Sequence, residues 1–160
     1  MISFNKFGYI SPPGLYILTV DEFEEIFTGM NNEPHRRGLF KSYKLYVSEL
    51  LKIVEQPFFQ LIGGSFVTCK TWPQDIDIVT FVPYVFEQNN TLKQSLRELF
   101  ERYEFSSAKS GLHTFFSLIP DESNPDQAKF EAHYQYWIDT FSSSIEKNTD
   151  PKGIVKLHFS

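Results

Sequence analysis

The sequence predicts a single α/β (α+β) domain in which helices flank a small mixed sheet. Segments with the periodicity of amphipathic helices alternate with short runs rich in Ile, Val and Phe, as expected for helices packed on a sheet. Hydrophobic residues make up 41% of the 160 residues and aromatic residues 17%, which is enough for a self-sufficient core. Proline or glycine follows several of these segments and separates them.

The domain is expected to cover residues 1–160, with residues 1–56 as an N-terminal helical extension. Residues 12–14, Pro-Pro-Gly, are typical of an extended segment. Residues 19–22, Thr-Val-Asp-Glu, match a capping box, which predicts a short helix that ends near Phe27.

A longer helix is expected over residues 36–55, and Pro57 follows it. Its core-facing positions are Tyr43, Val47, Leu50 and Val54. The later strands are expected at residues 58–62, 75–82, 112–119 and 153–159, and the later helices at residues 92–103 and 126–141.

Two short motifs in the middle of the chain are typical of phosphate and metal binding. Gly64 and Ser65 follow the first of the expected strands, and Asp75 and Asp77 open the second. Side chains at i and i+2 of a strand project from the same face, so the two carboxylates are expected to lie together. Adjacent carboxylates repel each other unless a cation lies between them, and Mg²⁺ is commonly held by one or two carboxylates plus substrate phosphates.

The turn at Gly64 also has features of a phosphate-binding loop. Gly64 allows the backbone to approach a phosphate closely, and Ser65 offers its N–H and its hydroxyl. If a helix begins at Phe66, its N-terminal N–H groups also face the anion. Lys70 is within reach of a triphosphate in this interpretation, and the alternative is a solvated loop lysine.

At these residues the chain resembles the nucleotidyltransferase superfamily, whose fold is shared with the catalytic region of DNA polymerase beta. It is more similar still to a group of short prokaryotic nucleotidyltransferase-like proteins, and this similarity extends over nearly the whole chain. The central segments are specific, whereas the terminal ones are weak alone. The matching segments are residues 13–14, 19–23, 64–70, 73–77, 136–139 and 151–155.

The resemblance implies a reaction as well as a fold. Gly64 and Ser65 would bind the phosphates of a nucleoside triphosphate, and Asp75 and Asp77 would bind Mg²⁺ or Mn²⁺. A nucleoside monophosphate would then move to a hydroxyl group on a protein or an RNA. Relatives often act as toxins or antitoxins in paired prokaryotic modules, and some modify tRNA or a partner protein. The implied partners are therefore a toxin, an antitoxin or a tRNA.

One departure from the superfamily pattern leaves two alternatives open. Members usually carry a third carboxylate on a later strand, but here the candidate strand has His113 at that position. His113 can act as a substitute base, since histidine accepts a proton, although it is a poor Mg²⁺ ligand. Alternatively, the site is degenerate and the protein is a catalytically weak binding subunit or antitoxin. Asp121 and Glu122, beyond the strand, are weaker substitutes.

Composition restricts the classes of binding partner and the cellular compartment that we expect. The net charge of -5 argues against general attraction to nucleic acids or anionic membranes. The only local basic cluster, residues 35–37 with Lys41 and Lys44, can meet RNA phosphates or form a solvated helix face. The single cysteine, Cys69, excludes an internal disulfide and fits a reducing, cytoplasmic setting. We expect neither a signal peptide nor a membrane span, since no apolar run approaches roughly 20 residues.

Overall fold

The computed structural model describes residues 2–105, 110–121, 126–144 and 151–160. The strands are Ser3–Phe4 (β1), Ile10–Ser11 (β2), Leu15–Leu18 (β3), Phe58–Gly63 (β4), Ile76–Pro83 (β5), Leu112–Ile119 (β6) and Ile154–Phe159 (β7). The helices are Val20–Thr28 (α1), Glu33–Ile53 (α2), Val85–Gln88 (α3), Asn90–Phe105 (α4) and Gln127–Ser142 (α6).

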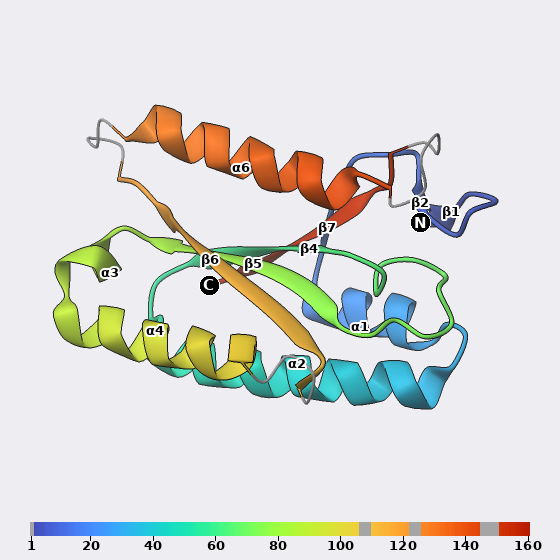
Figure 1. The fold of residues 1–160 in the computed structure, drawn as a ribbon, viewed down its shortest axis with the longest axis horizontal. Helices are drawn as coiled ribbons and strands as arrows, with labels where there is room; N and C mark the ends of the chain where they lie inside the picture. The colour runs from blue at the N-terminus through green and yellow to red at the C-terminus, as the bar shows by residue number, and fades with distance from the viewer. Residues whose placement is uncertain (1, 106–109, 122–125, 145–150) are drawn as a thin grey trace.

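These elements form three layers, and the middle layer is a mixed five-stranded sheet with the order β3-β7-β4-β5-β6 (Figure 1). Helix α6 covers one face of the sheet, and α1, α2 and α4 cover the other. Strands β1 and β2 form a separate antiparallel hairpin. The predicted fold class, a small mixed sheet flanked by helices, is confirmed.

Every helix and strand expected from the sequence is present, and the differences lie at their ends, near the N-terminus and at one short helix after β5. Helix α2 begins at Glu33, earlier than predicted, because Pro34 is accommodated in its first turn. The capping box at Thr19 is confirmed, since its hydroxyl accepts a hydrogen bond from the Glu22 N–H at 3.2 Å. Strands β1, β2 and β3 and helix α3 were not predicted, and the N-terminal region that was expected to be helical contains all three of these strands.

The pairing of β4, β5 and β6 determines where the site residues lie. Strand β4 runs antiparallel to β5, and β5 runs parallel to β6. In this register Asp77 is opposite Gly63 on one side and His113 on the other. The last residue of β4 and the first residues of β5 and β6 therefore lie side by side at the same end of these three strands.

A buried polar network fixes α2 against these strands. The Tyr43 hydroxyl donates to Gln60 Oε1 at 2.7 Å, and Gln60 Nε2 donates to Thr80 Oγ1 at 3.1 Å. The Tyr46 hydroxyl lies 2.9 Å from the same Thr80 oxygen. Because each buried polar group has a partner, the network avoids the penalty of an unpaired group and specifies how α2 sits on β4 and β5.

On the opposite face, α6 packs close to the end of β4. Trp137 and Phe141 of α6 are buried in a cluster that includes Leu61 and Val79. A Cβ atom added at Gly63 would lie 2.4 Å from Phe141 Cγ, so only glycine permits this approach. The turn that follows Gly63 is thus held between α6 and the layer formed by α1 and α2.

Candidate functional site

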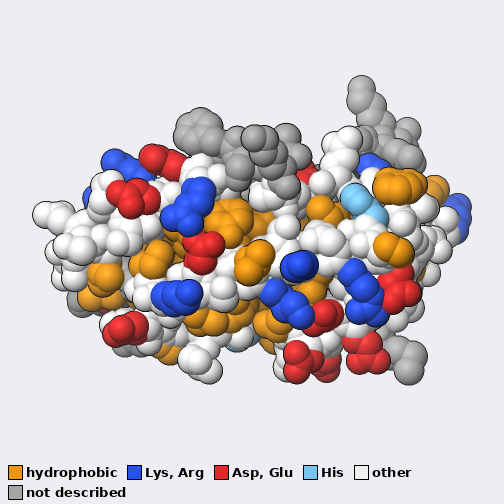
Figure 2. Space-filling view, turned by 90° about the horizontal axis from the view of Figure 1, so that it is seen from below, with side chains coloured by type: hydrophobic (Ala, Val, Ile, Leu, Met, Phe, Trp, Pro, Cys, Tyr) orange, Lys and Arg blue, Asp and Glu red, His pale blue; other side chains and the backbone are white. Residues whose placement is uncertain are grey.

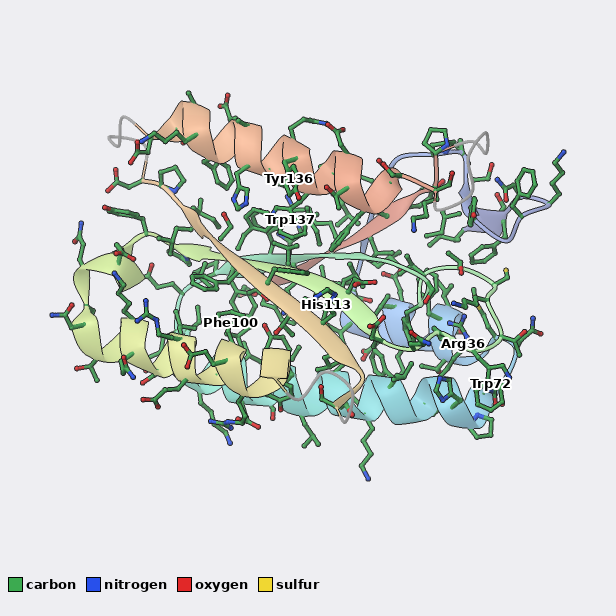
Figure 3. The ribbon with its side chains drawn as sticks, in the orientation of Figure 1. Arg36, Trp72, Phe100, His113, Tyr136 and Trp137 are labelled. Carbon is green, nitrogen blue, oxygen red and sulfur yellow. The ribbon has the colours of Figure 1, made fainter. Side chains whose placement is uncertain are left out.

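The structure brings together three side chains that the sequence singled out. Ligand atoms of Asp75, Asp77 and His113 all lie within 4.8 Å of one another. His113 Nδ1 lies 3.0 Å from Asp77 Oδ1, and these residues are direct partners on β5 and β6. The prediction that Asp75 and Asp77 lie together is confirmed. Figure 3 shows His113 near the middle of the molecule, on β6.

Gly64 makes the room in which the Asp77 carboxylate lies. Its φ is +71°, in the left-handed region that favours glycine. A Cβ atom at this position would lie 1.7 Å from Asp77 Oδ2. The absence of a side chain at Gly64 therefore accommodates a carboxylate of the protein itself, in addition to any role in phosphate approach.

The helix considered at Phe66 is wrong, because residues 64–67 form a turn. The hydrogen bonds of Arg36 explain why no helix forms there. Its Nη1 donates to Phe66 O at 2.7 Å, and its Nη2 donates to Thr68 O at 2.7 Å and to Lys70 O at 2.6 Å. A fourth bond, from Nη1 to Phe27 O at 3.0 Å, ties this segment to α1. These carbonyl groups point at the guanidinium, so they are not available to a helix.

A cavity of about 560 Å³ adjoins this turn. Ser65 and Lys70 both line it, together with two lysines that the sequence did not single out, Lys6 and Lys152. The remaining lining residues are Phe7, Gly8, Tyr9, Thr68 and Cys69. The cavity thus joins the predicted phosphate-binding turn to the N-terminal hairpin and to the segment before β7.

Lys152 is unusual because it is 94% buried, with a relative exposure of 6%. In the described part of the chain its ammonium group makes no hydrogen bond or ion pair, and its Nζ atom is not among the fully buried unpartnered atoms, so it reaches the space of the cavity. Burial lowers its pKa, and the charge of Asp77 acts in the opposite direction. A lysine with a buried stem therefore presents its Nζ to the cavity, near the Asp77 carboxylate.

The electrostatics of Asp75 favour a bound cation. Burial raises the pKa of Asp75, and the neighbouring Asp77 carboxylate raises it further, while His113 and Lys70 act to lower it. A divalent ion between the carboxylates would relieve both the desolvation and the repulsion. Carboxylate oxygens are ligands that suit both Mg²⁺ and Mn²⁺.

The weaker substitutes for a third carboxylate do not join this cluster. Asp121 follows the far end of β6, whereas His113 lies near its beginning, and an extended strand rises about 3.3 Å per residue. Several strand residues separate the two positions, so Asp121 is too distant to complete the site. Glu122 lies outside the described residues.

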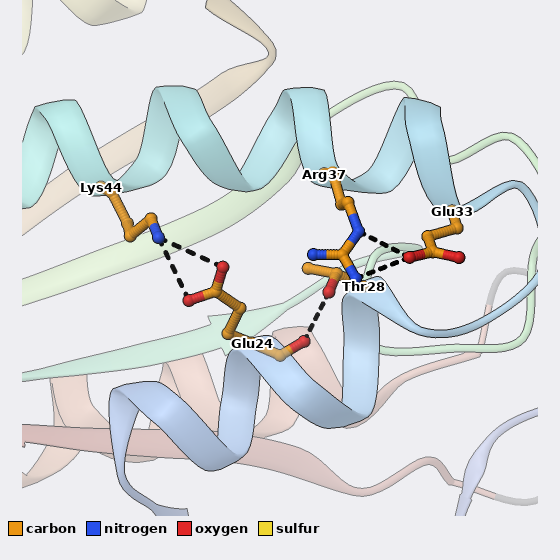
Figure 4. Close-up of polar contacts among 5 residues, drawn as sticks. All are labelled: Glu24, Thr28, Glu33, Arg37 and Lys44. Carbon is orange, nitrogen blue, oxygen red and sulfur yellow. Dashed lines mark hydrogen bonds and ion pairs between the residues drawn. The ribbon is translucent and has the colours of Figure 1, made fainter.

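The basic cluster on α2 does not form a basic face. Arg36 is fully buried, and Arg37 and Lys44 pair with Glu33 and Glu24 (Figure 4). Viewed from below, Lys and Arg side chains are interspersed with Asp and Glu (Figure 2). Of the two alternatives for residues 35–37 with Lys41 and Lys44, these ion pairs favour the solvated helix face for Arg37 and Lys44, and contact with RNA stays a prediction.

Sequence reasoning missed the roles of Arg36, Lys6 and Lys152, and the signals for Arg36 and Lys152 differ. Arg36 lies four positions before Phe40 and seven before Tyr43, on the buried stripe of α2, so the sequence did carry a sign of its burial. Lys152 lies two residues before the first residue of β7, in a segment that matched only weakly.

A model of a family of unknown function, DUF6932, matches residues 2–158. The chain belongs to the DUF6932 family. Searches of curated proteins and of solved structures found no match to this DUF6932 chain. Among its described residues, no helix is long and apolar enough to cross a membrane.

Proposed function

We propose that this DUF6932 protein is a metal-dependent nucleotidyltransferase, which moves a nucleoside monophosphate from a nucleoside triphosphate to a hydroxyl group on a protein or an RNA. The observation that carries the proposal is the grouping of Asp75, Asp77 and His113 beside the cavity lined by Ser65 and Lys70. Asp75 and Asp77 would hold Mg²⁺ or Mn²⁺, and Ser65 and Lys70 would contact the phosphates.

The proposed reaction is an in-line displacement at the α-phosphorus. The acceptor oxygen bonds to that phosphorus, the bond to the β-phosphate oxygen breaks, and pyrophosphate leaves. A divalent cation held by the carboxylates supplies charge neutralisation on the phosphates. With Nδ1 of His113 donating to Asp77, its Nε2 has a free lone pair and takes the proton of the acceptor hydroxyl.

Labelled nucleotides test this proposal directly. The protein is incubated with cell extract, Mg²⁺ or Mn²⁺, and each nucleoside triphosphate labelled at either the α- or the γ-phosphate. Nucleotidyl transfer places the α-label, and not the γ-label, on a protein or an RNA. Asp77→Asn should abolish transfer, whereas Asp139→Asn, which alters an exposed carboxylate of α6, should not. Transfer that survives Asp77→Asn would remove this site from the mechanism.

A second candidate is a catalytically weak binding subunit or antitoxin, which the presence of His113 in place of a third carboxylate favours. It predicts nucleotide binding without label transfer, and a biological activity that survives Asp75→Ala with Asp77→Ala. A toxin, antitoxin or tRNA partner belongs to both candidates as a proposal. So does a cytoplasmic setting, which suits both nucleoside triphosphates and the free thiol of Cys69.

A further inference from the structure

Lys152 offers its ammonium group to the cavity, and no described residue supplies that group with a hydrogen-bond acceptor. Its stem is buried, and the charge of Asp77 favours its protonated form. The backbone holds Lys152 in place, since its N–H donates to Ser142 O at 2.9 Å and the next N–H, of Gly153, donates to Ile10 O at 3.0 Å. The backbone from which this side chain extends is therefore fixed beside the cavity.

The cavity that Lys152 lines is cationic although the protein is acidic. Three lysines from separate segments, Lys6, Lys70 and Lys152, face it. None of the nine residues that line it is acidic. Its volume of about 560 Å³ lies within the roughly 300–1,000 Å³ typical of small-molecule sites.

The N-terminal hairpin forms one wall of the cavity and is fixed to the opposite wall. Cys69 N–H donates to Gly8 O at 2.9 Å, and Tyr9 forms an isolated β-bridge with Thr68. Phe7 and Tyr9 bring two rings to this wall, with centroids 6.2 Å apart. The cavity thus combines cationic groups with an aromatic surface in a preformed arrangement.

We infer that this cavity binds the polyphosphate chain of a nucleoside triphosphate, with Lys152 as its buried anchor and the N-terminal hairpin, through Lys6, as its outer wall. The inference rests on the proposed function and extends it, because it assigns the phosphates to three lysines from distant segments. The charged amine of Lys152 donates to a phosphate oxygen, which supplies a hydrogen-bond acceptor. The rings of Phe7 and Tyr9 offer a surface to the nucleoside.

The test is a calorimetric titration with inorganic tripolyphosphate in the presence of a chelator, so that no metal takes part. Lys152→Met should weaken binding by at least about tenfold, as the loss of a charge-assisted hydrogen bond implies. Lys41→Met removes the same charge from an exposed position on α2, and it should change affinity by no more than about twofold, since exposed charges contribute little. Equal losses in the two variants would show a general charge effect and overturn the inference.

A measurement on the wild-type protein keeps the inference testable if Lys152→Met does not fold. Tripolyphosphate should shift the amide NMR signals of Ser65, Lys70 and Lys152, and shifts confined to other regions, or no binding, would overturn it. A nucleoside triphosphate should bind more tightly than tripolyphosphate. Equal affinity for tripolyphosphate and for every nucleoside triphosphate would assign the cavity to inorganic polyphosphate, and it would contradict a contact between the cavity and the nucleoside.

The same experiments separate this inference from the proposed function. Tripolyphosphate binding without any label transfer supports the phosphate site and removes the activity. Label transfer in a protein whose Lys152→Met variant binds tripolyphosphate normally supports the activity and removes Lys152 from the site.

Discussion

Replacing Gly64 by alanine should displace the Asp77 carboxylate from the candidate metal site. Cβ of the alanine would lie 1.7 Å from Asp77 Oδ2, whereas Cβ contacts under 3.0 Å essentially never occur. The carboxylate must therefore move by about 1.3 Å, the difference between these two distances. That movement is enough to disrupt its 3.0 Å contact with His113. The left-handed backbone at this position adds about 1–2 kcal/mol of strain.

Gly63→Ala provides a matched control at the neighbouring position. Its Cβ would lie 2.4 Å from Phe141 Cγ, so the clash falls on the packing of α6 and not on the carboxylates. Overpacking of this kind costs about 1–3 kcal/mol, so both variants should lose a comparable amount of stability. Chemical denaturation measures that loss, and calorimetric titration with Mn²⁺ measures the site.

The two variants should differ in their affinity for Mn²⁺. Gly64→Ala should weaken binding by about tenfold or more, since even the loss of an outer contact to a ligand costs roughly 10–100-fold. Gly63→Ala should bind Mn²⁺ with nearly wild-type affinity. Wild-type affinity in Gly64→Ala would refute the link between Gly64 and the carboxylate geometry, and an absence of binding to the wild-type protein would refute the metal site.

Three further predictions concern the scaffold. Arg36→Met should lower the free energy of unfolding by about 3 kcal/mol or more, because four carbonyl groups lose a charged donor; urea denaturation measures this, and a small loss would contradict the clamp. Gly38→Ala should raise that free energy by about 0.5–1 kcal/mol, since the site is exposed in α2 with open space around it. Burial raises the pKa of Tyr43 and Tyr46 above the ordinary value of 10.0, so the folded state holds both protons more tightly than the unfolded state. The contribution of these two hydroxyl groups to the free energy of unfolding is complete below the ordinary pKa of 10.0, and it is lost as the pH rises through the raised pKa values of the folded state. Tyrosinate absorbance of both should therefore rise only as the protein unfolds, and an earlier rise would contradict their burial.

The long periodic segments could be predicted because local sequence determines them. The buried stripe of α2 and the apolar run of β5 each repeat over several turns or residue pairs. Strand β3 could not be predicted in the same way, because it has only four residues and its pairing with β7 joins distant parts of the chain. Likewise, Pro34 indicates a loop in isolation, but it also fits the first turn of a helix.

The residues of the candidate site also fall into those that local sequence predicts and those that only the tertiary structure brings together. The proximity of Asp75 and Asp77 follows from strand geometry alone, so two positions in sequence were enough to predict it. Lys6 and Lys152 reach the cavity only through the docking of the hairpin and the position of β7, which no local pattern encodes. The burial of Arg36 was encoded locally by its place on the α2 stripe, but a charged residue at such a position is rarely buried without a charged partner.

The arrangement of charge around the site restricts the kind of ligand that suits it. Asp75 and Asp77 repel each other and attract a cation, whereas Lys70 and Lys152, on the cavity side, attract an anion. A metal ion alone would offset the Asp77 charge that acts on Lys152, and a phosphate alone would leave the carboxylates repelling each other. A metal–triphosphate complex satisfies both groups at once, because its cation and its anionic chain are joined. Binding of either part should therefore favour binding of the other, and the coupling must be equal in both directions.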